Sequence, residues 1–432
     1  MKSSIKFAFC TLTILIQLGC GGGKIDPITN ADPDAIRTQP VVAARETDWP
    51  WWAGPTGDFV SKSQSIPTEF GESKNLVWKT AIPGEGHASP IVVGDKVFLA
   101  LAENNKSMSL ACFSRGDGSE LWKTELHSGT FMRSHQKNSQ ASSTPACDGD
   151  SVFTAFMIDN GIQVSSVSID GKINWQKTAG SFQTRHGYGT SPIIYKSIVI
   201  VAGDNQGSGF IAAFDRPTGD LVWRVSRKNA PSYATPAVLS LNGKDHLVIS
   251  GIDQVIGYDP ATGDELWSSE GPAPTTANTV ISDGTLVFAG GGYPDHQFFA
   301  INPSSSEIVW KDKIKNYVPS PILIGEQIAV PQDGGIMTCY LKLDGTELWK
   351  LRIGQDLSGS PVRVGKRLFL GGEKGTMFVI DVSGKGKILA KNKLDSRIMT
   401  TPAICGDQIF VRTASSLYCF AELNPVSKPG KQ

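Results

Sequence analysis

The chain has few cysteines, and none falls in a pattern typical of a haem, metal or redox-active disulfide site. Seven occur among 432 residues, with no adjacent pair, no Cys-x-x-Cys and no Cys-x-x-Cys-His. The last pattern attaches a c-type haem, so the sequence offers no haem through which electrons could leave. Five of the cysteines lie in or beside predicted strands and are expected to be buried free thiols. These five are Cys112, Cys147, Cys339, Cys405 and Cys419.

Charge is also scarce, because only 19% of the residues are charged and 41 basic residues balance 41 acidic ones. A chain without net charge has no overall electrostatic attraction to nucleic acid, so no nucleic-acid partner is expected. The motifs Gly-x-x-x-x-Gly-Lys-Ser/Thr, His-Glu-x-x-His and Gly-x-Ser-x-Gly are absent. The sequence therefore predicts no metal site and gives no support for a nucleotide site or a serine hydrolase. An enzyme whose groups come from distant loops stays open.

The start of the chain predicts export. An apolar stretch over residues 7–18 follows two lysines and is too short to span a bilayer permanently, so residues 1–20 are expected to be a signal peptide. Residues 21–48 are rich in Gly, Pro, Ala and Asp without a period, and predict a flexible tether. Its root-mean-square reach would be about 30 Å.

The predicted signal ends in Leu18-Gly19-Cys20 and resembles a bacterial lipobox, whose cysteine is acylated after export. Gln17 and Leu18 depart from the usual aliphatic and small residues of that pattern. We expect Cys20 to be lipidated and to anchor the protein to a membrane of the cell envelope, facing the periplasm or the exterior. The alternative is an ordinary cleaved signal with an incidental cysteine.

The sequence is rich in one repeated unit of about 40 to 55 residues. Each unit starts with Ser/Thr-Pro, continues through three apolar strands and ends in a strand with tryptophan. The starts are Ser89-Pro90, Thr144-Pro145, Ser191-Pro192, Thr235-Pro236, Ser320-Pro321, Ser360-Pro361 and Thr401-Pro402, with a degenerate start at Ala277-Asn278. The tryptophans are Trp122, Trp175, Trp223, Trp267, Trp310 and Trp349, and Ile388-Leu389 is expected in that place in the seventh unit.

The eighth unit stops after its third strand, and the missing strand is available near the other end of the chain at Leu76-Val77-Trp78-Lys79. Borrowing that strand would close a ring and remove exposed sheet edges. The sequence therefore predicts an all-β fold, an eight-bladed β-propeller of four-stranded antiparallel blades over residues 49–424, followed by a tail at 425–432. The tryptophans are expected to fill the wedges between blades.

Two groups of motifs carry a resemblance to known families. Asp259–Trp267 and Asp344–Trp349 resemble the quinoprotein-type repeat shared by PQQ-dependent alcohol dehydrogenases and the propeller lipoprotein of the outer-membrane β-barrel assembly machinery. Trp49–Pro55 and Gly86–Pro90 resemble exported PQQ-like propeller proteins of planctomycete-type bacteria, in which an arginine usually stands at the position of Ala53. The resemblance is specific for the fold and weak for activity.

The dehydrogenase side of this resemblance implies a quinone in the axial funnel, bound through Ca²⁺, with an aspartate as base and an adjacent-cysteine disulfide against the ring. This chain has no adjacent cysteines, and its ten tryptophans are assigned to blade strands or to the segment at 49–52. We therefore expect a non-enzymatic scaffold without a cofactor, and keep a PQQ- and Ca²⁺-dependent enzyme or small-molecule binder as the alternative.

Function is expected on the face where each outer strand connects to the next inner strand. Its longest predicted insertion is Lys123–Ser142. We expect a monomer that binds an envelope protein or peptide segment there, although polar residues favour loops in any case. The candidate residues are His87, Arg133, His135, Arg185, His186, Tyr188, Tyr233, His296 and Arg397.

Overall fold

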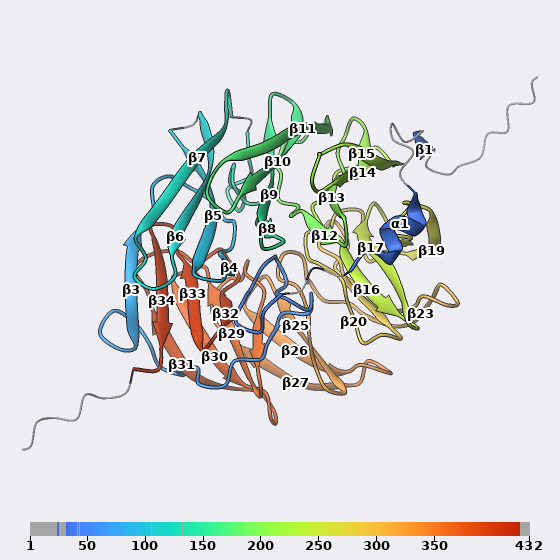
Figure 1. Ribbon diagram of the computed structural model, residues 1–432. Helices are drawn as coiled ribbons and strands as arrows, with labels where there is room; N and C mark the ends of the chain where they lie inside the picture. Colours follow the sequence, from blue (N-terminus) through green and yellow to red (C-terminus); the bar gives the residue numbers. More distant parts are fainter. Residues whose placement is uncertain are drawn as a thin grey trace, which may run out of the picture.

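A computed structural model describes residues 24–25, 32–40, 42, 44–104, 106–131 and 133–423. Strands dominate these residues and form eight sheets arranged in a ring (Figure 1). The predicted eight-bladed propeller is therefore confirmed. Cys20, the predicted signal and the predicted tail lie outside the described residues. Among the described helices, none combines the length and apolar character that a membrane crossing requires.

The blades follow one another in chain order, and each runs from an inner to an outer strand. Blade 1 has β4 (Ile91–Val93), β5 (Lys96–Glu103), β6 (Ser107–Ser114) and β7 (Glu120–Ser128). Blade 2 has β8 (Ala146–Cys147), β9 (Ser151–Ile158), β10 (Gly161–Ser168) and β11 (Ile173–Ser181). Blade 3 has β12 (Ile193–Tyr195), β13 (Ile198–Gly203), β14 (Gly209–Asp215) and β15 (Leu221–Arg227). Blade 4 has β16 (Ala237–Leu241), β17 (Lys244–Gly251), β18 (Gln254–Tyr258) and β19 (Glu265–Glu270).

The second half of the ring repeats the same order. Blade 5 has β20 (Ile281–Ser282), β21 (Val287–Gly290), β22 (Phe298–Asn302) and β23 (Glu307–Asp312). Blade 6 has β24 (Ile322–Ile324), β25 (Gln327–Gln332), β26 (Ile336–Leu341) and β27 (Glu347–Arg352). Blade 7 has β28 (Val362–Val364), β29 (Arg367–Gly372), β30 (Thr376–Asp381) and β31 (Lys387–Lys393). Blade 8 has β32 (Ala403–Cys405), β33 (Gln408–Arg412), β34 (Ser416–Ala421) and, from the other end, β3 (Leu76–Ala81).

Blade 8 is completed by the strand that the sequence analysis assigned to it. β3 pairs antiparallel with β34, with Leu76 opposite Phe420 and Thr80 opposite Leu417. In Figure 1 the blue β3 lies beside the red β34 at the rim. Because the pairing joins residues near both ends of the chain, it closes the ring.

The Ser/Thr-Pro starts form a belt of hydrogen bonds from blade to blade. The Ser89 N–H donates to Thr144 Oγ1 at 3.0 Å, and the Thr401 N–H donates to Ser89 Oγ at 3.0 Å, which links blade 8 to blade 1. Thr144, Ser191, Ser320 and Ser360 make the same bond to the next blade. The hydroxyls that accept these bonds therefore each satisfy a buried backbone N–H of the preceding blade.

The belt corrects the predicted start of blade 5. Ile281 pairs with Phe288 as Ile91 pairs with Phe98, which places Thr279-Val280 at the position of Ser89-Pro90. The Thr279 N–H donates to Ser320 Oγ at 3.0 Å, as a belt residue does. The predicted start, Ala277-Asn278, was wrong because valine replaces the proline of the Ser/Thr-Pro motif in this blade.

The outer-strand tryptophans pack between blades, as expected. The Trp122 indole lies against Gly171 of blade 2, which has φ +90° and where a Cβ would come within 2.8 Å of the ring. Trp122 Nε1 also donates to the carbonyl of Ile169 at 3.0 Å. Trp78, Trp175, Trp223 and Trp310 donate to carbonyls of the following blade in the same way. In blade 7 the tryptophan position of blade 6 is taken by Ala390, not by Ile388-Leu389 as expected, because Ala390 pairs with Val379 as Trp349 pairs with Cys339 and both strands carry the same β-bulge.

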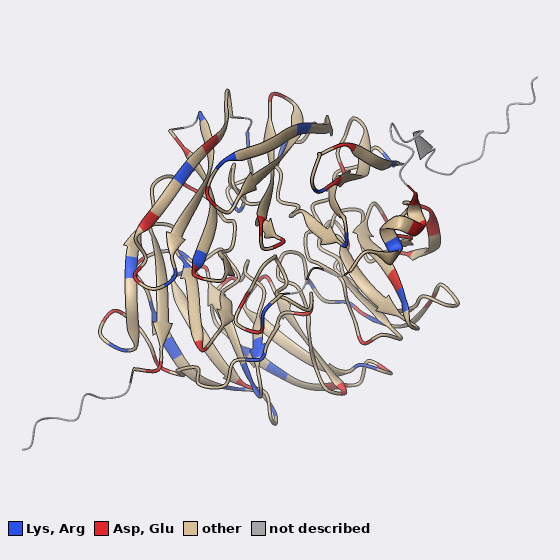
Figure 2. Cartoon of the chain, viewed as in Figure 1, with Lys and Arg blue, Asp and Glu red and all other residues tan. Residues whose placement is uncertain are grey.

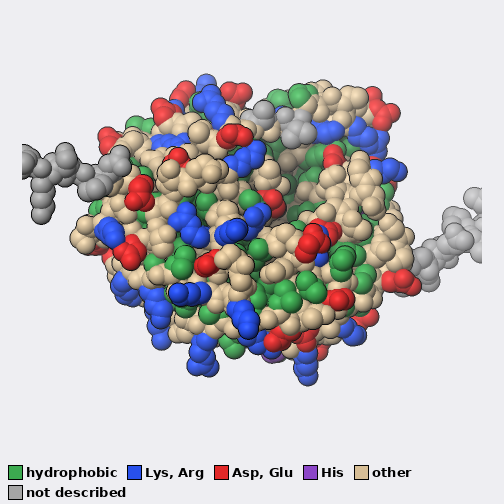
Figure 3. All heavy atoms as spheres, turned by 90° about the horizontal axis from the view of Figure 1, so that it is seen from below, with side chains coloured by type: hydrophobic (Ala, Val, Ile, Leu, Met, Phe, Trp, Pro, Cys, Tyr) green, Lys and Arg blue, Asp and Glu red, His purple; other side chains and the backbone are tan. Residues whose placement is uncertain are grey.

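Apolar residues next to the tryptophans face solvent on the rim. Leu121, Leu266 and Val309 are each close to half exposed. Figure 3, seen from the lower side of Figure 1, shows apolar groups separated by charged side chains, and Figure 2 shows both signs of charge mixed around the ring. Such scattered apolar residues are ordinary for a protein surface.

The segment before the ring is folded against it in two places. Helix α1 (Pro33–Thr38) buries Ile36 on blades 3 and 4, and its Arg37 pairs with Asp259 at 2.6 Å. β1 (Lys24–Ile25) pairs with β15 as a fifth strand. Part of the segment expected as a tether therefore lies on the blades. The buried Ile36 holds the helix there, and the Gly- and Pro-rich composition of the segment gives no indication of it.

Residues 48–61 cross the axis of the ring. Trp49 is fully buried and exchanges backbone hydrogen bonds with Val92 of blade 1 at 2.7 and 2.9 Å. At the other end β2 (Val60–Ser61) pairs parallel with β28 of blade 7. Between them, Trp52 Nε1 donates to Thr279 Oγ1 at 2.9 Å. The blue segment lies over the middle of the ring in Figure 1.

Candidate functional site

We call the side of the ring with the connections 82–90, 129–145, 182–192 and 228–236, and their equivalents in later blades, the crossover face. The predicted insertion Lys123–Ser142 is shorter than expected at its start, because β7 continues to Ser128. His127 therefore lies on a strand, where its Nε2 is 3.1 Å from Ser165 Oγ. The loop proper, residues 129–145, still reaches beyond its own blade.

Three neighbouring connections bring a cluster of side chains together on the crossover face. The Tyr233 hydroxyl lies 2.9 Å from His186 Nδ1, and the rings of His186 and His135 are 5.6 Å apart between centroids. The His135 N–H donates to the carbonyl of His186 at 3.1 Å. Burial, and then the positive charges of His135, Arg133 and Arg185, lower the pKa of His186. We call these five residues the His-Tyr cluster; its histidines and arginines are exposed.

The remaining candidates lie apart from this cluster or have structural contacts. Tyr188 is buried, and its hydroxyl donates to the carbonyl of Ala202 at 3.1 Å, so it is a packing residue. His296 is half-buried in the β21–β22 connection. Arg397 is exposed, with Nη2 at 4.0 Å from Glu373 Oε2. His87 is half-buried under the 129–145 loop, and its N–H donates to Ser139 Oγ at 2.9 Å.

The 129–145 loop is fixed on its far side by an ion pair. Lys137 Nζ lies 2.9 Å from Glu373 Oε1 in the β29–β30 turn of blade 7. The same carboxylate oxygen accepts a hydrogen bond from Ser358 Oγ at 2.7 Å. Because Glu373 is only 12% exposed, this pair is better shielded from water than a surface pair. The loop therefore presents His135 from a fixed position, which no linear motif could indicate.

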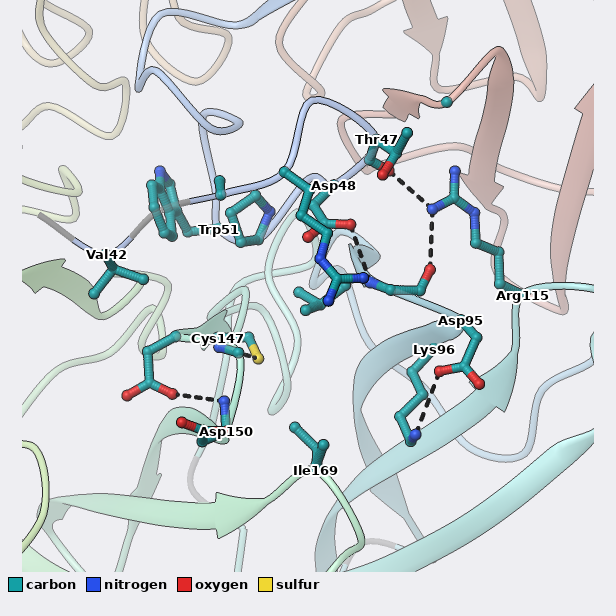
Figure 4. A pocket seen from close by; sticks show the side chains of 18 of the residues that line it. Val42, Thr47, Asp48, Trp51, Asp95, Lys96, Arg115, Cys147, Asp150 and Ile169 are labelled. Atoms are coloured by element: carbon teal, nitrogen blue, oxygen red, sulfur yellow. Dashed lines mark hydrogen bonds and ion pairs between the residues drawn. The ribbon is translucent and has the colours of Figure 1, made fainter.

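Sequence reasoning missed a pocket on the opposite face of the ring (Figure 4). Its volume is about 910 Å³, and it is lined by residues 42, 44, 45, 47, 48, 50 and 51 together with turns of blades 1, 2 and 8. Arg115 borders it and donates to the carbonyls of Thr47 and Gly94 at 2.8 and 3.0 Å. None of the predicted candidate residues lines it. The signal that could have located it is the Trp49–Pro55 motif, whose crossing of the axis forms one wall.

The comparisons with known proteins agree with this architecture. The family model described as outer membrane protein assembly factor BamB matches residues 69–207, 106–351 and 332–424. The chain belongs to this family. It is 22% identical over 373 residues to the outer membrane protein assembly factor BamB of Bordetella pertussis, covering 82% of this chain and 88% of that protein.

Two solved structures place the BamB-family chain beside two kinds of protein. BamB from Moraxella catarrhalis has a TM-score of 0.60 and 13% identity, with 79% of this chain and 98% of that one covered. The quinohemoprotein alcohol dehydrogenase of Comamonas testosteroni has a TM-score of 0.66 and 12% identity, with 93% and 85% covered. At these identities the likeness concerns the fold alone.

Within the described residues, the acidic, histidine and cysteine side chains form no cluster suited to a quinone held through Ca²⁺. A Ca²⁺ site needs several oxygen ligands at one place. The described residues contain no group of three or more His, Cys, Asp or Glu side chains that could hold a metal ion. The five cysteines within them are buried and free, and burial raises the pKa of Cys405 to about 12, so this thiol stays protonated. We therefore derive no redox step, and the absence of a cofactor stays a prediction.

Proposed function

We propose that the protein is a non-enzymatic scaffold of the bacterial envelope that binds a component of an outer-membrane protein assembly machinery. The observation that supports this most is the family match over residues 69–424, together with relatives that carry the name of an outer membrane protein assembly factor. A ring with many connections on one face suits this role, because rigid blades hold loops in fixed positions for a partner.

The proposed binding surface is the His-Tyr cluster with the 129–145 loop. Arginine and tyrosine are enriched at protein interfaces, and the arginines and histidines of the cluster are exposed. The imidazole and phenol groups of His186 and Tyr233 already hydrogen-bond each other, so little side-chain freedom is left to lose on binding. The partner chemistry proposed is an extended or acidic segment that lies across these three connections.

The test is recovery of assembly-machinery proteins after chemical cross-linking in the organism's own envelope, identified by mass spectrometry. We expect recovery with the natural chain, and about a tenfold loss when residues 128–140 are replaced by a Gly-Ser linker or when His135→Ala and His186→Ala are combined. Lys385→Ala, an exposed change on the opposite face, is the control and should leave recovery unchanged.

The outcomes of this test distinguish the scaffold proposal from the choice of binding surface. If the natural chain captures no assembly protein, the scaffold proposal is wrong. If capture occurs but survives the loop replacement, the crossover face is the wrong surface. Titration of the purified protein with PQQ and Ca²⁺ addresses the alternative enzyme, since stoichiometric quinone absorbance bound to the protein would favour the dehydrogenase.

Membrane attachment through Cys20 is part of the proposal. We expect the natural chain to sediment with envelope membranes and the Cys20→Ala variant to be found in the soluble fraction, because one thiol is the proposed point of acylation. Sedimentation of the variant with membranes at the natural level would contradict the lipid anchor.

A further inference from the structure

Arg412 occupies a position at which the other blades carry a small residue or proline. It lies two residues beyond Phe410, which pairs with Ala403 of the inner strand. In blade 1 the same register leads from Phe98 to Ala100. The equivalents in blades 2 to 7 are Ala155, Ala202, Ser250, Gly290, Pro331 and Gly371. A guanidinium therefore enters the seam between blades 8 and 1. At the other seven seams the equivalent position contributes no guanidinium.

One edge of this guanidinium is occupied. Nη1 of Arg412 donates to the carbonyls of Ala88 at 3.0 Å and Ala100 at 2.9 Å, which joins blade 8 to β5 of blade 1 and to the connection that precedes β4. Gly86 makes room for the group, because a Cβ there would come within 2.4 Å of Nη2. These contacts explain a structural role for Arg412 in the seam, but they use only one nitrogen of three.

The other edge has no partner among the described residues. Nε and Nη2 of Arg412 are both buried without a hydrogen bond, and the residue as a whole is 1% exposed. His87 lies in the same region, and its Nδ1 is also buried without a partner. The Nε and Nη2 hydrogens of an arginine point in the same direction and form the fork that binds an anion with two parallel bonds.

Arg227 is a second buried arginine in this fold, and its guanidinium has a counter-charge. It is also about 1% exposed at its side chain, and its Nε and Nη2 donate to the two carboxylate oxygens of Asp204 at 2.7 and 3.0 Å. The same fork is thus filled by a carboxylate in blade 3 and by no protein group in the seam of blades 8 and 1. Burial without a counter-charge is costly, and it lowers the pKa of Arg412 to about 9.

We propose that the Nε–Nη2 fork of Arg412, beside His87, is a binding site for a small monovalent anion, either a halide such as chloride or a formate-sized carboxylate. The size follows from burial, since Gly86 packs against the guanidinium and the adjoining His87 and Ala88 are held by their N–H groups to the Ala141 carbonyl of the 129–145 loop at 3.0 and 2.9 Å. The anion neutralises the guanidinium and stabilises the seam next to the blade that closes the ring.

The test is thermal unfolding of the full-length protein at constant ionic strength, with chloride or formate replacing gluconate, which is too large for the site. We expect Tm to rise by about 3 °C in the natural chain and to stay constant in Arg412→Met. Arg397→Gln, which removes an exposed cation of the same face, is the matched control and should keep the rise. A rise with formate alone identifies a carboxylate, and a rise with chloride identifies a halide site.

A second measurement keeps the proposal testable if Arg412→Met fails to fold. Crystals of the natural chain grown with bromide should give an anomalous peak within hydrogen-bonding distance of Arg412 Nη2, and Gly86→Ala should remove that peak because its Cβ displaces the fork. Equal Tm values in the three salts, or bromide peaks only at exposed lysines and arginines, would overturn the proposal.

Discussion

Replacing Trp78 by alanine is expected to lower the free energy of unfolding by about 4 kcal/mol, because a large buried ring is lost and a cavity remains. The side chain is 6% exposed and comes from β3, the strand that completes blade 8. Its indole lies against Gly118 of blade 1 and 6.0 Å from the Phe410 ring between centroids, and its Nε1 donates to the carbonyl of Arg115 at 2.9 Å. One residue thus packs within blade 8 and against blade 1.

The neighbouring residue on the same strand supplies the control. Val77 is 37% exposed, so Val77→Ala should cost less than about 1 kcal/mol. Urea unfolding followed by far-ultraviolet circular dichroism compares the two variants without relying on tryptophan fluorescence. A Trp78→Ala midpoint equal to that of Val77→Ala would mean that β3 does not hold the ring closed.

Much of this fold could be predicted from the repeat, because neighbouring blades make the same contacts around the ring. The Ser/Thr hydroxyls of the belt satisfy N–H groups of the preceding blade, and five of the outer tryptophans donate to a carbonyl of the next blade, so the physical demands of a seam recur in the sequence. Blade count, closure through Trp78 and the structural use of the tryptophans follow from that recurrence. Where the motif lacks its proline, as at Thr279-Val280, the pattern is harder to recognise.

The candidate site was less predictable because it depends on contacts between loops far apart in the chain. Sequence reasoning assigned His135, His186 and Tyr233 to one face, but their contact distances depend on how three connections pack. The same reasoning included Tyr188, which the fold buries. The crossing of the axis by Trp49, the ion pair of Lys137 with Glu373 and the unpartnered fork of Arg412 have no periodic signature, since each occurs once.

Replacing Asp204 by asparagine is expected to destabilise the protein by about 3 to 4 kcal/mol, because it leaves the Arg227 guanidinium buried and without its counter-charge. The side chains of Asp204 and Arg227 are 3% and 1% exposed, and Arg227 Nη1 also donates to the Tyr258 hydroxyl at 3.0 Å. Urea unfolding measures the loss. Glu46→Gln, which breaks the exposed pair of Glu46 with Lys62, is the control and should change stability by less than about 0.5 kcal/mol.

The double variant Asp204→Leu with Arg227→Met separates the cost of an unpaired charge from the value of the pair. It should recover stability to within about 2 kcal/mol of the natural chain, because apolar side chains of similar volume replace both charges.

Asp204 also precedes Gln206, whose N–H donates to the carbonyl of Gln183 at 3.2 Å in the connection that holds His186. Asp204→Asn should therefore weaken partner capture along with stability. If Asp204→Asn proved as stable as Glu46→Gln, water would have to solvate the Arg227 guanidinium in the folded protein.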